Sequence, residues 1–193
     1  MLSYTESLKI LKETNALQQG HFILSSGLHS GQYIQCAQLL SKPLKAYQIC
    51  KSLADKIKNK FKDIDIILSP AMGGIIIGYE IGRLLNLETI FAERINNSFT
   101  LRRDFVIRKG SKVLIVEDVI TTGKSSLECS EIVKKASGSI LGYACIIDRS
   151  NGKSLIKNDI VSQLEINIPT YQNDNLPDEL VSLKPVKPGT RIL

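Results

Sequence analysis

The chain has 193 residues, of which 43% are hydrophobic and 23% charged, and its formal net charge is +6 at pH 7. This length suits one domain with a sizeable core, and the composition excludes disordered, collagen-like and disulfide-scaffold chains. No stretch approaches the roughly 18 consecutive apolar residues of a spanning helix, so we expect no membrane insertion. The excess of lysine and arginine suits a phosphate-rich partner, either nucleic acid or a phosphorylated metabolite.

The N-terminus and the cysteines indicate the cellular compartment. The first residues lack the basic and apolar stretches of a secretory signal, so a cytoplasmic location is expected. No Cys-x-x-Cys pair occurs among the four cysteines, which are Cys36, Cys50, Cys129 and Cys145. This spacing indicates neither a zinc site nor a disulfide framework, and we expect four buried, reduced thiols.

The N-terminal region is predicted to form a small cap. Apolar residues at helical spacing predict an amphipathic helix that begins near Leu8 and ends at Gly20. Residues 21–35 are strand-like between glycine and serine, and helical spacing returns over residues 44–61.

From residue 63 onward, short apolar strands alternate with helices across glycine-rich turns. This order predicts a parallel sheet covered on both faces, with both turns facing one ligand crevice at the carboxyl ends of the strands. The tail from Pro169 is predicted to be a loop-rich extension packed on the domain. The predicted strands are 64–68, 89–92, 112–116 and 140–147, the helices 75–87 and 124–135, and the turns 69–74 and 118–123.

The segment 113–126 carries the clearest chemistry. It is not a nucleotide P-loop, because Asp118 stands where that motif requires glycine. Residues 121–125 open a helix, where free backbone N–H groups and the helix dipole bind phosphate. The adjacent Glu117 and Asp118 would repel a second anion and therefore suit the hydroxyls of a ribose. A sugar phosphate is the expected occupant, and an ordinary helix cap is the alternative.

This segment resembles the thirteen-residue signature of the type I phosphoribosyltransferases. Its Val-Glu-Asp-Val-Ile-Thr-Thr-Gly form is most similar to the orotate phosphoribosyltransferase family. Residues 69–74 resemble that family's pyrophosphate loop and 101–105 its mobile catalytic loop. Residues 21–27 with Tyr33 resemble its N-terminal hood, and residues 187–191 resemble the end of its compact bacterial form.

The resemblance runs from about residue 10 to the C-terminus and implies an α/β fold. In the type I phosphoribosyltransferase fold, a central, mainly parallel sheet is flanked by helices and carries a small N-terminal hood. By this resemblance, residues 1–193 form a single domain, with the hood region at 1–40 and the core with the sugar-diphosphate site at 60–150.

The resemblance also implies an activity. The family transfers the phosphoribosyl group of 5-phospho-α-D-ribose 1-diphosphate to orotate, giving orotidine 5′-monophosphate and pyrophosphate in pyrimidine biosynthesis. Mg²⁺ assists, and no dedicated protein ligand for it is implied. A homodimer is implied, in which loop 95–105 reaches the partner's site.

Two alternatives stay open at this point. One is a phosphoribosyltransferase for another nucleobase. The other is a DNA-binding regulator, but the ~20 residues before the hood leave no room for a helix-turn-helix. We therefore expect small-molecule substrates and no nucleic acid.

The resemblance implies roles for individual residues. Glu117 and Asp118 are expected to hold the ribose hydroxyls and to stabilise the positive charge that develops at C1. The 5-phosphate is assigned to Thr121, Thr122, Gly123, Lys124 and Ser125. Arg149 and Thr121 are expected to contact orotate. The other implied substrate contacts are Val119, Ile120, Ala71, Met72, Gly73, Arg94, Ser25 and Tyr33.

The mobile loop departs from the family pattern. Longer members carry lysines and a histidine there, whereas residues 94–108 hold four arginines and neither lysine nor histidine. Arginine keeps its proton, so Arg102 and Arg103 are expected to neutralise pyrophosphate without protonating it. An exposed basic hairpin is the alternative. Asp104 replaces a family glycine, and the group that protonates the leaving pyrophosphate stays open.

Overall fold

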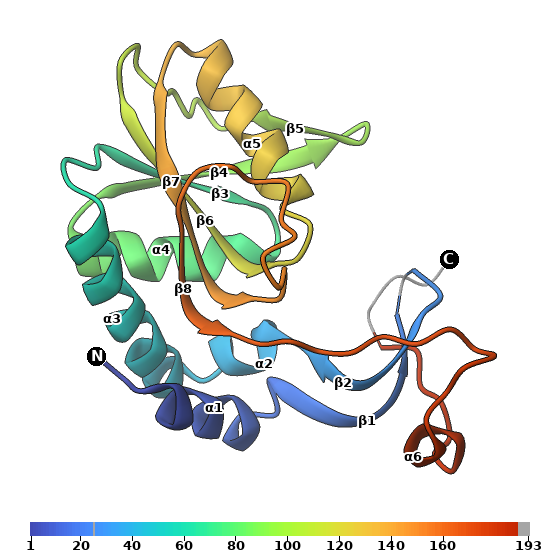
Figure 1. Ribbon diagram of the computed structural model, residues 1–193. Helices are drawn as coiled ribbons and strands as arrows, with labels where there is room; N and C mark the ends of the chain where they lie inside the picture. The colour runs from blue at the N-terminus through green and yellow to red at the C-terminus, as the bar shows by residue number, and fades with distance from the viewer. Residues whose placement is uncertain (25, 189–193) are drawn as a thin grey trace.

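The structure is a computed structural model that describes residues 1–24 and 26–188. A six-stranded sheet forms its centre, and a long hairpin extends from one end (Figure 1). The strand order is β5-β4-β3-β6-β7-β8, parallel throughout except for the β4–β5 pair, so the predicted mainly parallel α/β sheet is confirmed. The strands are β3 (Ile66–Pro70), β4 (Glu88–Ile95), β5 (Ser98–Leu101), β6 (Lys112–Ile120), β7 (Ser139–Asp148) and β8 (Ile160–Glu165).

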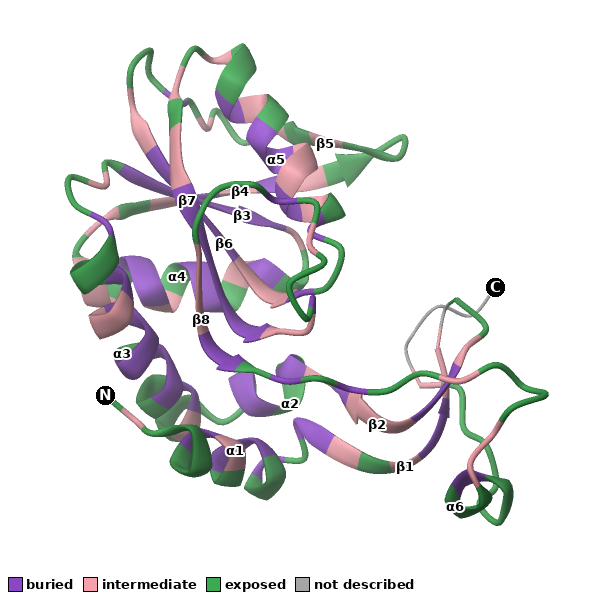
Figure 2. Cartoon of the chain, viewed as in Figure 1, coloured by how far each residue is buried: buried purple, intermediate pink, exposed green. Residues whose placement is uncertain are grey.

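Helices cover both faces of this sheet. α3 (Pro43–Lys60) and α4 (Gly73–Leu85) pack on one face, and α5 (Lys124–Lys135) packs on the other. The side chains of β6 alternate between these layers: Leu114 faces α3 and α4, and Val113 faces α5. The central strands are therefore buried on both sides, as Figure 2 shows in purple.

The N-terminal helix is shorter than predicted. α1 (Tyr4–Glu13) begins with a capping box, in which Ser3 N donates to Glu6 Oε2 at 2.7 Å and Glu6 N donates to Ser3 Oγ at 3.2 Å. The predicted end at Gly20 is wrong, because Asn15 adopts a left-handed conformation with φ 57° and Leu17 then pairs with Ile34 in a hairpin.

The hood is built from both ends of the chain. β1 (Leu17–Ile23) and β2 (His29–Ile34) form the antiparallel hairpin predicted as strand-like. The tail, predicted to pack on the domain, runs along this hairpin, where Ile23 N donates to the Val186 carbonyl at 2.9 Å and His29 N to the Tyr171 carbonyl at 2.9 Å. Four elements were not predicted: β5, β8, α2 (Cys36–Leu40) and α6 (Asp178–Val181).

Two expectations from composition bear on the described residues. The four cysteines are free and buried, as predicted. No helix in the described part of the chain is long and apolar enough to cross a membrane.

Candidate active site

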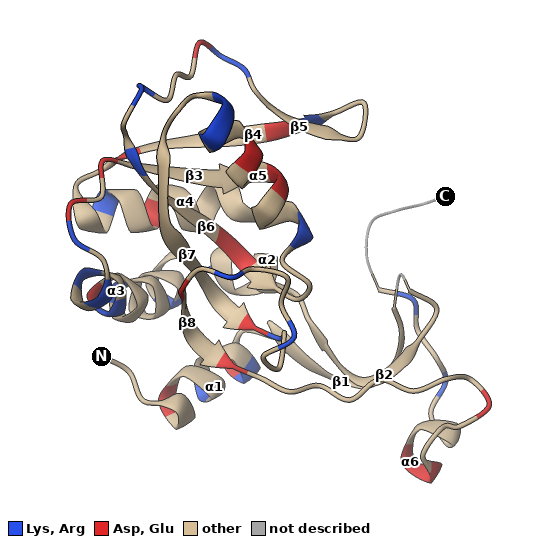
Figure 3. Ribbon diagram, turned by 45° about the horizontal axis from the view of Figure 1, so that its top comes forward, with Lys and Arg blue, Asp and Glu red and all other residues tan. Residues whose placement is uncertain are grey.

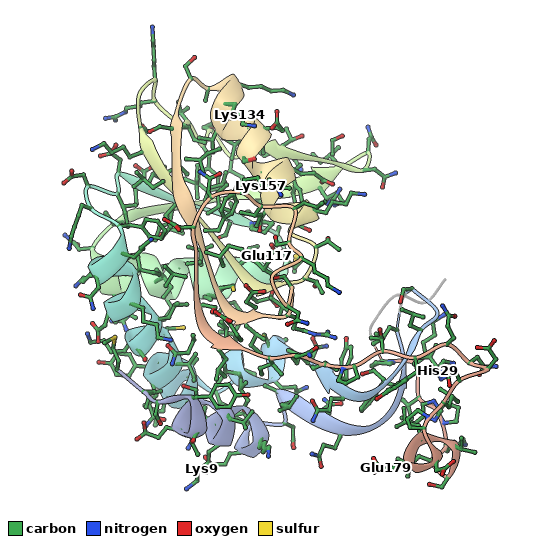
Figure 4. The ribbon with its side chains drawn as sticks, in the orientation of Figure 1. Lys9, His29, Glu117, Lys134, Lys157 and Glu179 are labelled. Atoms are coloured by element: carbon green, nitrogen blue, oxygen red, sulfur yellow. The ribbon has the colours of Figure 1, made fainter. Side chains whose placement is uncertain are left out.

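The candidate site lies at the carboxyl end of β6. The predicted turn at 118–123 is wrong at its start, because β6 continues to Ile120, where Val119 pairs with Ile147 and Ile120 with Asp148. Glu117 and Asp118 are therefore strand residues with fixed directions. Because successive strand side chains point to opposite faces, Glu117 faces α5 and Asp118 faces α4. Figure 4 shows Glu117 on β6 below α5.

The pyrophosphate-loop candidate meets the acidic pair. Ala71, Met72 and Gly73 connect β3 to the first turn of α4, across a cis Ala71–Met72 peptide. A Cβ added to Gly73 would lie 2.8 Å from both carboxylate oxygens of Asp118. The backbone of this loop therefore approaches Asp118 as closely as a residue without a side chain permits. The two glycine-rich turns face one edge of the sheet.

The phosphate cradle begins α5. Thr121 and Thr122 are exposed, Gly123 is the N-cap with φ 78°, and Lys124 and Ser125 form the start of the helix. A Cβ on Gly123 would lie 2.7 Å from Ile156 Cγ1, so only glycine fits this position. The loop after β7 supports the turn, because Leu155 N donates to the Thr122 carbonyl at 3.0 Å. Lys124 N donates to Thr122 Oγ1 at 3.3 Å, and the remaining N–H groups at this helix start form an anion site.

Burial sets the charge state of Glu117. Loss of solvation raises the pKa of Glu117, a hydrogen bond from the Ser126 hydroxyl lowers it and the nearby Asp118 raises it, and together they place it at about 7. Near neutral pH the ligand-free protein therefore holds this carboxyl in both its protonated and its ionised form.

Burial and hydrogen bonds also act in opposite directions on the pKa of Asp118. Burial raises its pKa, whereas the backbone N–H groups of Val119 and Asp118 lower it. Below it lies the buried thiol of Cys36, whose Sγ is 4.0 Å from the Asp118 carbonyl oxygen. The acidic pair is visible as the red part of β6 in Figure 3.

The orotate-site candidates Arg149 and Tyr33 come together. Arg149 follows β7, and its backbone N–H donates to the Ile120 carbonyl at 2.8 Å, which ties it to the end of β6. Burial lowers the pKa of Arg149 and the nearby Tyr33 opposes this. Among the described residues, Arg149 Nε is buried with no hydrogen-bond partner. A half-buried guanidinium whose buried Nε has a free donor suits a planar carboxylate ligand.

The loop arginines do not reach the acidic pair in this structure. Arg103 Nε donates to Glu93 Oε1 at 2.7 Å, and Arg102 lies 3.8 Å from the same carboxylate. Arg103 and Asp104 form a turn with φ 60° and 58°, a region that favours glycine. The replacement of the family glycine by Asp104 therefore falls on a left-handed position.

Arg94 lies near the turn of the β4–β5 hairpin, where it pairs with Phe99. Its guanidinium pairs with Glu128 of α5 at 2.7 Å, donates to the Asn97 carbonyl at 2.6 Å and covers the Phe99 ring at 4.1 Å. These contacts join the hairpin to the phosphate helix. The predicted contact at Ser25 and the end of the closing motif, residues 189–191, lie outside the described residues.

Sequence reasoning missed three polar residues around the site. Ser126 holds Glu117, Glu93 pairs with the loop arginines, and Glu128 pairs with Arg94. Ser126 carried a usable signal, because it lies in the motif segment 113–126, in the first turn of the helix that follows Glu117 and Asp118. The two glutamates carried none, since their partners come from other elements.

Comparison with known proteins shows the family of this chain. The model of the phosphoribosyl transferase domain family matches residues 37–177. Orotate phosphoribosyltransferase from Methylorubrum populi is 47% identical over 189 residues, which cover 97% of this chain and 96% of that protein. The enzyme of that name from Parvibaculum lavamentivorans is 46% identical, covering 95% of this chain and 96% of the relative.

Solved structures share the fold. The crystal structure of orotate phosphoribosyltransferase from Aeropyrum pernix superposes with a TM-score of 0.73 at 22% identity, covering 82% of this chain and 92% of that one. Adenine phosphoribosyltransferase from Thermoanaerobacter pseudethanolicus gives a TM-score of 0.60 at 16% identity, over 70% and 88% of the two chains.

The raised pKa of Glu117 predicts a pH-dependent effect on stability. Its folded pKa of about 7 exceeds the ordinary value of 4.5, so the stabilisation it contributes below 4.5 is lost as the pH rises through 7. Glu117→Gln removes this loss. At about pH 8.5 its free energy of unfolding should exceed that of the wild type by roughly 1–3 kcal/mol, with little difference near pH 4.5.

Urea denaturation at both pH values measures this. Glu131→Gln is the matched control, because it removes an exposed carboxylate from α5 and should show no such pH-dependent gain. Equal pH dependence in the wild type and Glu117→Gln would contradict the assignment of a raised pKa to Glu117.

Proposed function

The chain belongs to the phosphoribosyl transferase family and, within it, to the orotate phosphoribosyltransferases. From this premise we propose that it transfers the phosphoribosyl group of 5-phospho-α-D-ribose 1-diphosphate to orotate, giving orotidine 5′-monophosphate and pyrophosphate in pyrimidine biosynthesis. The observation that carries the proposal is the close approach of the Gly73 loop to Asp118, beside the phosphate cradle at residues 121–125.

The sugar phosphate fits across the end of β6. The 5-phosphate accepts hydrogen bonds from the backbone N–H groups at the start of α5, with hydroxyls from Thr121, Thr122 and Ser125 around it. Lys124 is exposed at the same helix start and adds positive charge. The ribose then lies over Glu117 and Asp118, and its diphosphate reaches the loop at 71–73.

The acidic pair supplies the electrostatic part of catalysis. As the C1–pyrophosphate bond lengthens, positive charge develops on the ribose ring. These half-buried carboxylates stabilise that charge because less water screens them than at the surface, and the stabilisation exists only in the transition state. Binding of the sugar favours the ionised form of Glu117, because its hydroxyls donate to the carboxylate.

Mg²⁺ is proposed as the cofactor. Among residues 1–24 and 26–188, no group of three or more His, Cys, Asp or Glu side chains is placed to hold a metal ion. No protein ligand is assigned to it, because an ion that keeps several waters would take its other ligands from the ribose and diphosphate oxygens of the substrate. When bound, Mg²⁺ would neutralise charge on the leaving pyrophosphate.

The base site is assigned to Arg149 and Tyr33. The orotate carboxylate offers an acceptor to the partnerless Nε of Arg149, and the planar guanidinium matches the planar pyrimidine. A base that lacks a carboxylate would leave this buried donor without a charged partner. This supports orotate over adenine or uracil as the substrate.

A cytoplasmic homodimer is part of the proposal. Large apolar side chains are exposed together on α3, α4 and the preceding loop: Leu44 (84%), Tyr79 (65%), Ile76 (53%) and Met72 (83%). This face adjoins the pyrophosphate loop, so a second copy packed there would lie beside the site. Loop 95–105 is exposed and is proposed to reach the site of that copy, where Arg102 and Arg103 neutralise pyrophosphate.

Turnover tests the proposal directly. Purified protein with the sugar diphosphate, Mg²⁺ and orotate should consume orotate, followed as loss of its ultraviolet absorbance. Adenine or uracil in place of orotate should give no product. Turnover with adenine or uracil but not with orotate would move the chain to another nucleobase, and no turnover with any base would refute the assigned activity.

Arg149→Ala tests the base site. Truncating one partner of a buried charged hydrogen bond costs about 2–5 kcal/mol. The KM for orotate should therefore rise at least tenfold, with a much smaller change in the KM for the sugar diphosphate. Steady-state kinetics with each substrate varied in turn measures both. Equal effects on the two substrates would remove Arg149 from the orotate site.

Subunit mixing tests the loop and the dimer together. Asp118→Asn should lower kcat/KM by ~10²-fold, because it removes charge from the developing cation. Mixed with the Arg102→Ala/Arg103→Ala protein, it should form heterodimers with one intact site each. Random exchange at equal concentrations makes half the dimers mixed, so about a quarter of wild-type activity should return.

Native mass spectrometry verifies the exchange. If heterodimers form and the mixture is no more active than the mean of its parents, the loop does not act on the partner's site. A strictly monomeric protein with full activity would overturn the homodimer itself.

A further inference from the structure

Ser126 lies where the phosphate helix meets the acidic pair. It is the third residue of α5 and its side chain is fully buried. Its hydroxyl donates to Oε2 of Glu117. The same residue contributes a backbone N–H to the free groups at the helix start. Ser126 is therefore the point at which the phosphate cradle and the ribose carboxylates are joined.

The other groups around Glu117 do not replace this donor. Asp118 is a like charge on the same strand, and it raises the pKa of Glu117. Cys129 of α5 and Cys145 of β7 are buried thiols whose pKa values are raised by burial, so both are neutral. Among the described residues, the influence that lowers the pKa of Glu117 is the Ser126 hydroxyl.

We propose that Ser126 is a positioning residue for the phosphoribosyl transfer: its hydroxyl fixes one carboxylate oxygen of Glu117 and favours the charged form of that carboxylate. The other oxygen, Oε1, is then directed to the sugar hydroxyls. This inference rests on the proposed function, because it assigns Ser126 a part in the same reaction.

A neutral donor suits this task better than a cation. Lysine or arginine at this position would cancel the negative charge that has to stabilise the ribose cation. A hydroxyl orients and solvates the carboxylate while leaving its net charge intact. Because Ser126 belongs to α5, a shift of the helix on binding the 5-phosphate would be transmitted to Glu117.

The test measures the proton affinity of Glu117 in the ligand-free protein. Carboxyl carbon NMR, with Glu117→Gln to assign the resonance, should give a pKa for Glu117 that is about one unit higher in Ser126→Ala than in the wild type. The acid limb of kcat/KM, which reports the free enzyme, should move upward by the same amount. At about pH 7 the loss should be several-fold, and above pH 9 kcat/KM should approach that of the wild type.

Ser130→Ala is the matched control. Ser130 is also buried on α5, one turn further on, and its hydroxyl donates to the Leu127 carbonyl. This variant should leave both the NMR pKa of Glu117 and the acid limb of kcat/KM unchanged. Titration of the substrates themselves affects all variants equally, so it cannot produce a difference between them. Ser126→Cys, which keeps the volume but weakens the donor, should shift both values in the same direction and serves if Ser126→Ala does not fold.

An unchanged pKa of Glu117 in folded Ser126→Ala or Ser126→Cys would overturn the proposal. Equal shifts in Ser130→Ala would also overturn it, because a general loosening of α5 would then explain them. The NMR titration needs no turnover. Failure of the wild type to use orotate would therefore refute the proposed function, and it would leave the pKa of Glu117 measured by NMR unaffected.

Discussion

The partial burial of two adjacent carboxylates at the end of β6 is the constraint on which the site depends. A strand covered on both faces holds Glu117 and Asp118 half-buried, and this loss of solvation raises the pKa of both. Such desolvation opposes folding unless hydrogen bonds offset it. Here the hydrogen bonds offset the desolvation of Glu117 and Asp118 only in part, so both carboxylates retain a strong affinity for hydroxyl donors and for positive charge. A ribose ring that becomes cationic supplies both.

Elements on both faces of the sheet contact Glu117 and Asp118. On the α4 face, Gly73 brings loop backbone against Asp118 at a distance that no side chain would allow. On the α5 face, Gly123 opens the helix whose third residue holds Glu117. Arg149 is attached to the strand end through Ile120. Phosphate, sugar and base subsites are therefore arranged around one short piece of strand.

Local patterns predicted much of this arrangement. The helix at 124–135 has the predicted bounds, and the alternating strands and helices gave the correct class of sheet. The predicted end of α1 at Gly20 failed because Asn15 ends the helix locally, while glycine is tolerated at position 20 within β1. The turn at 118 failed because pairing with β7 extends β6, and such pairing has no local signal.

Contacts between distant segments account for what the sequence could not predict. The tail from residue 169 is poor in periodic pattern, yet it pairs with β1 and β2 through Val186 and Tyr171. The ion pair of Glu128 likewise depends on how the β4–β5 hairpin packs against α5, and that of Glu93 on how the loop after β5 folds back along β4. By contrast, motif residues next to a buried strand could be placed in advance, because the direction of a parallel strand fixes the edge at which they lie.

A crystal structure with orotidine 5′-monophosphate bound would test the three subsites together, because one ligand carries the phosphate, the ribose and the base. We expect the phosphate on the N–H groups of residues 122–125, the ribose hydroxyls on Glu117 and Asp118, and the pyrimidine carboxylate on Arg149. A nucleotide whose ribose hydroxyls lie away from the two carboxylates, or whose phosphate binds elsewhere than at the start of α5, would contradict this arrangement.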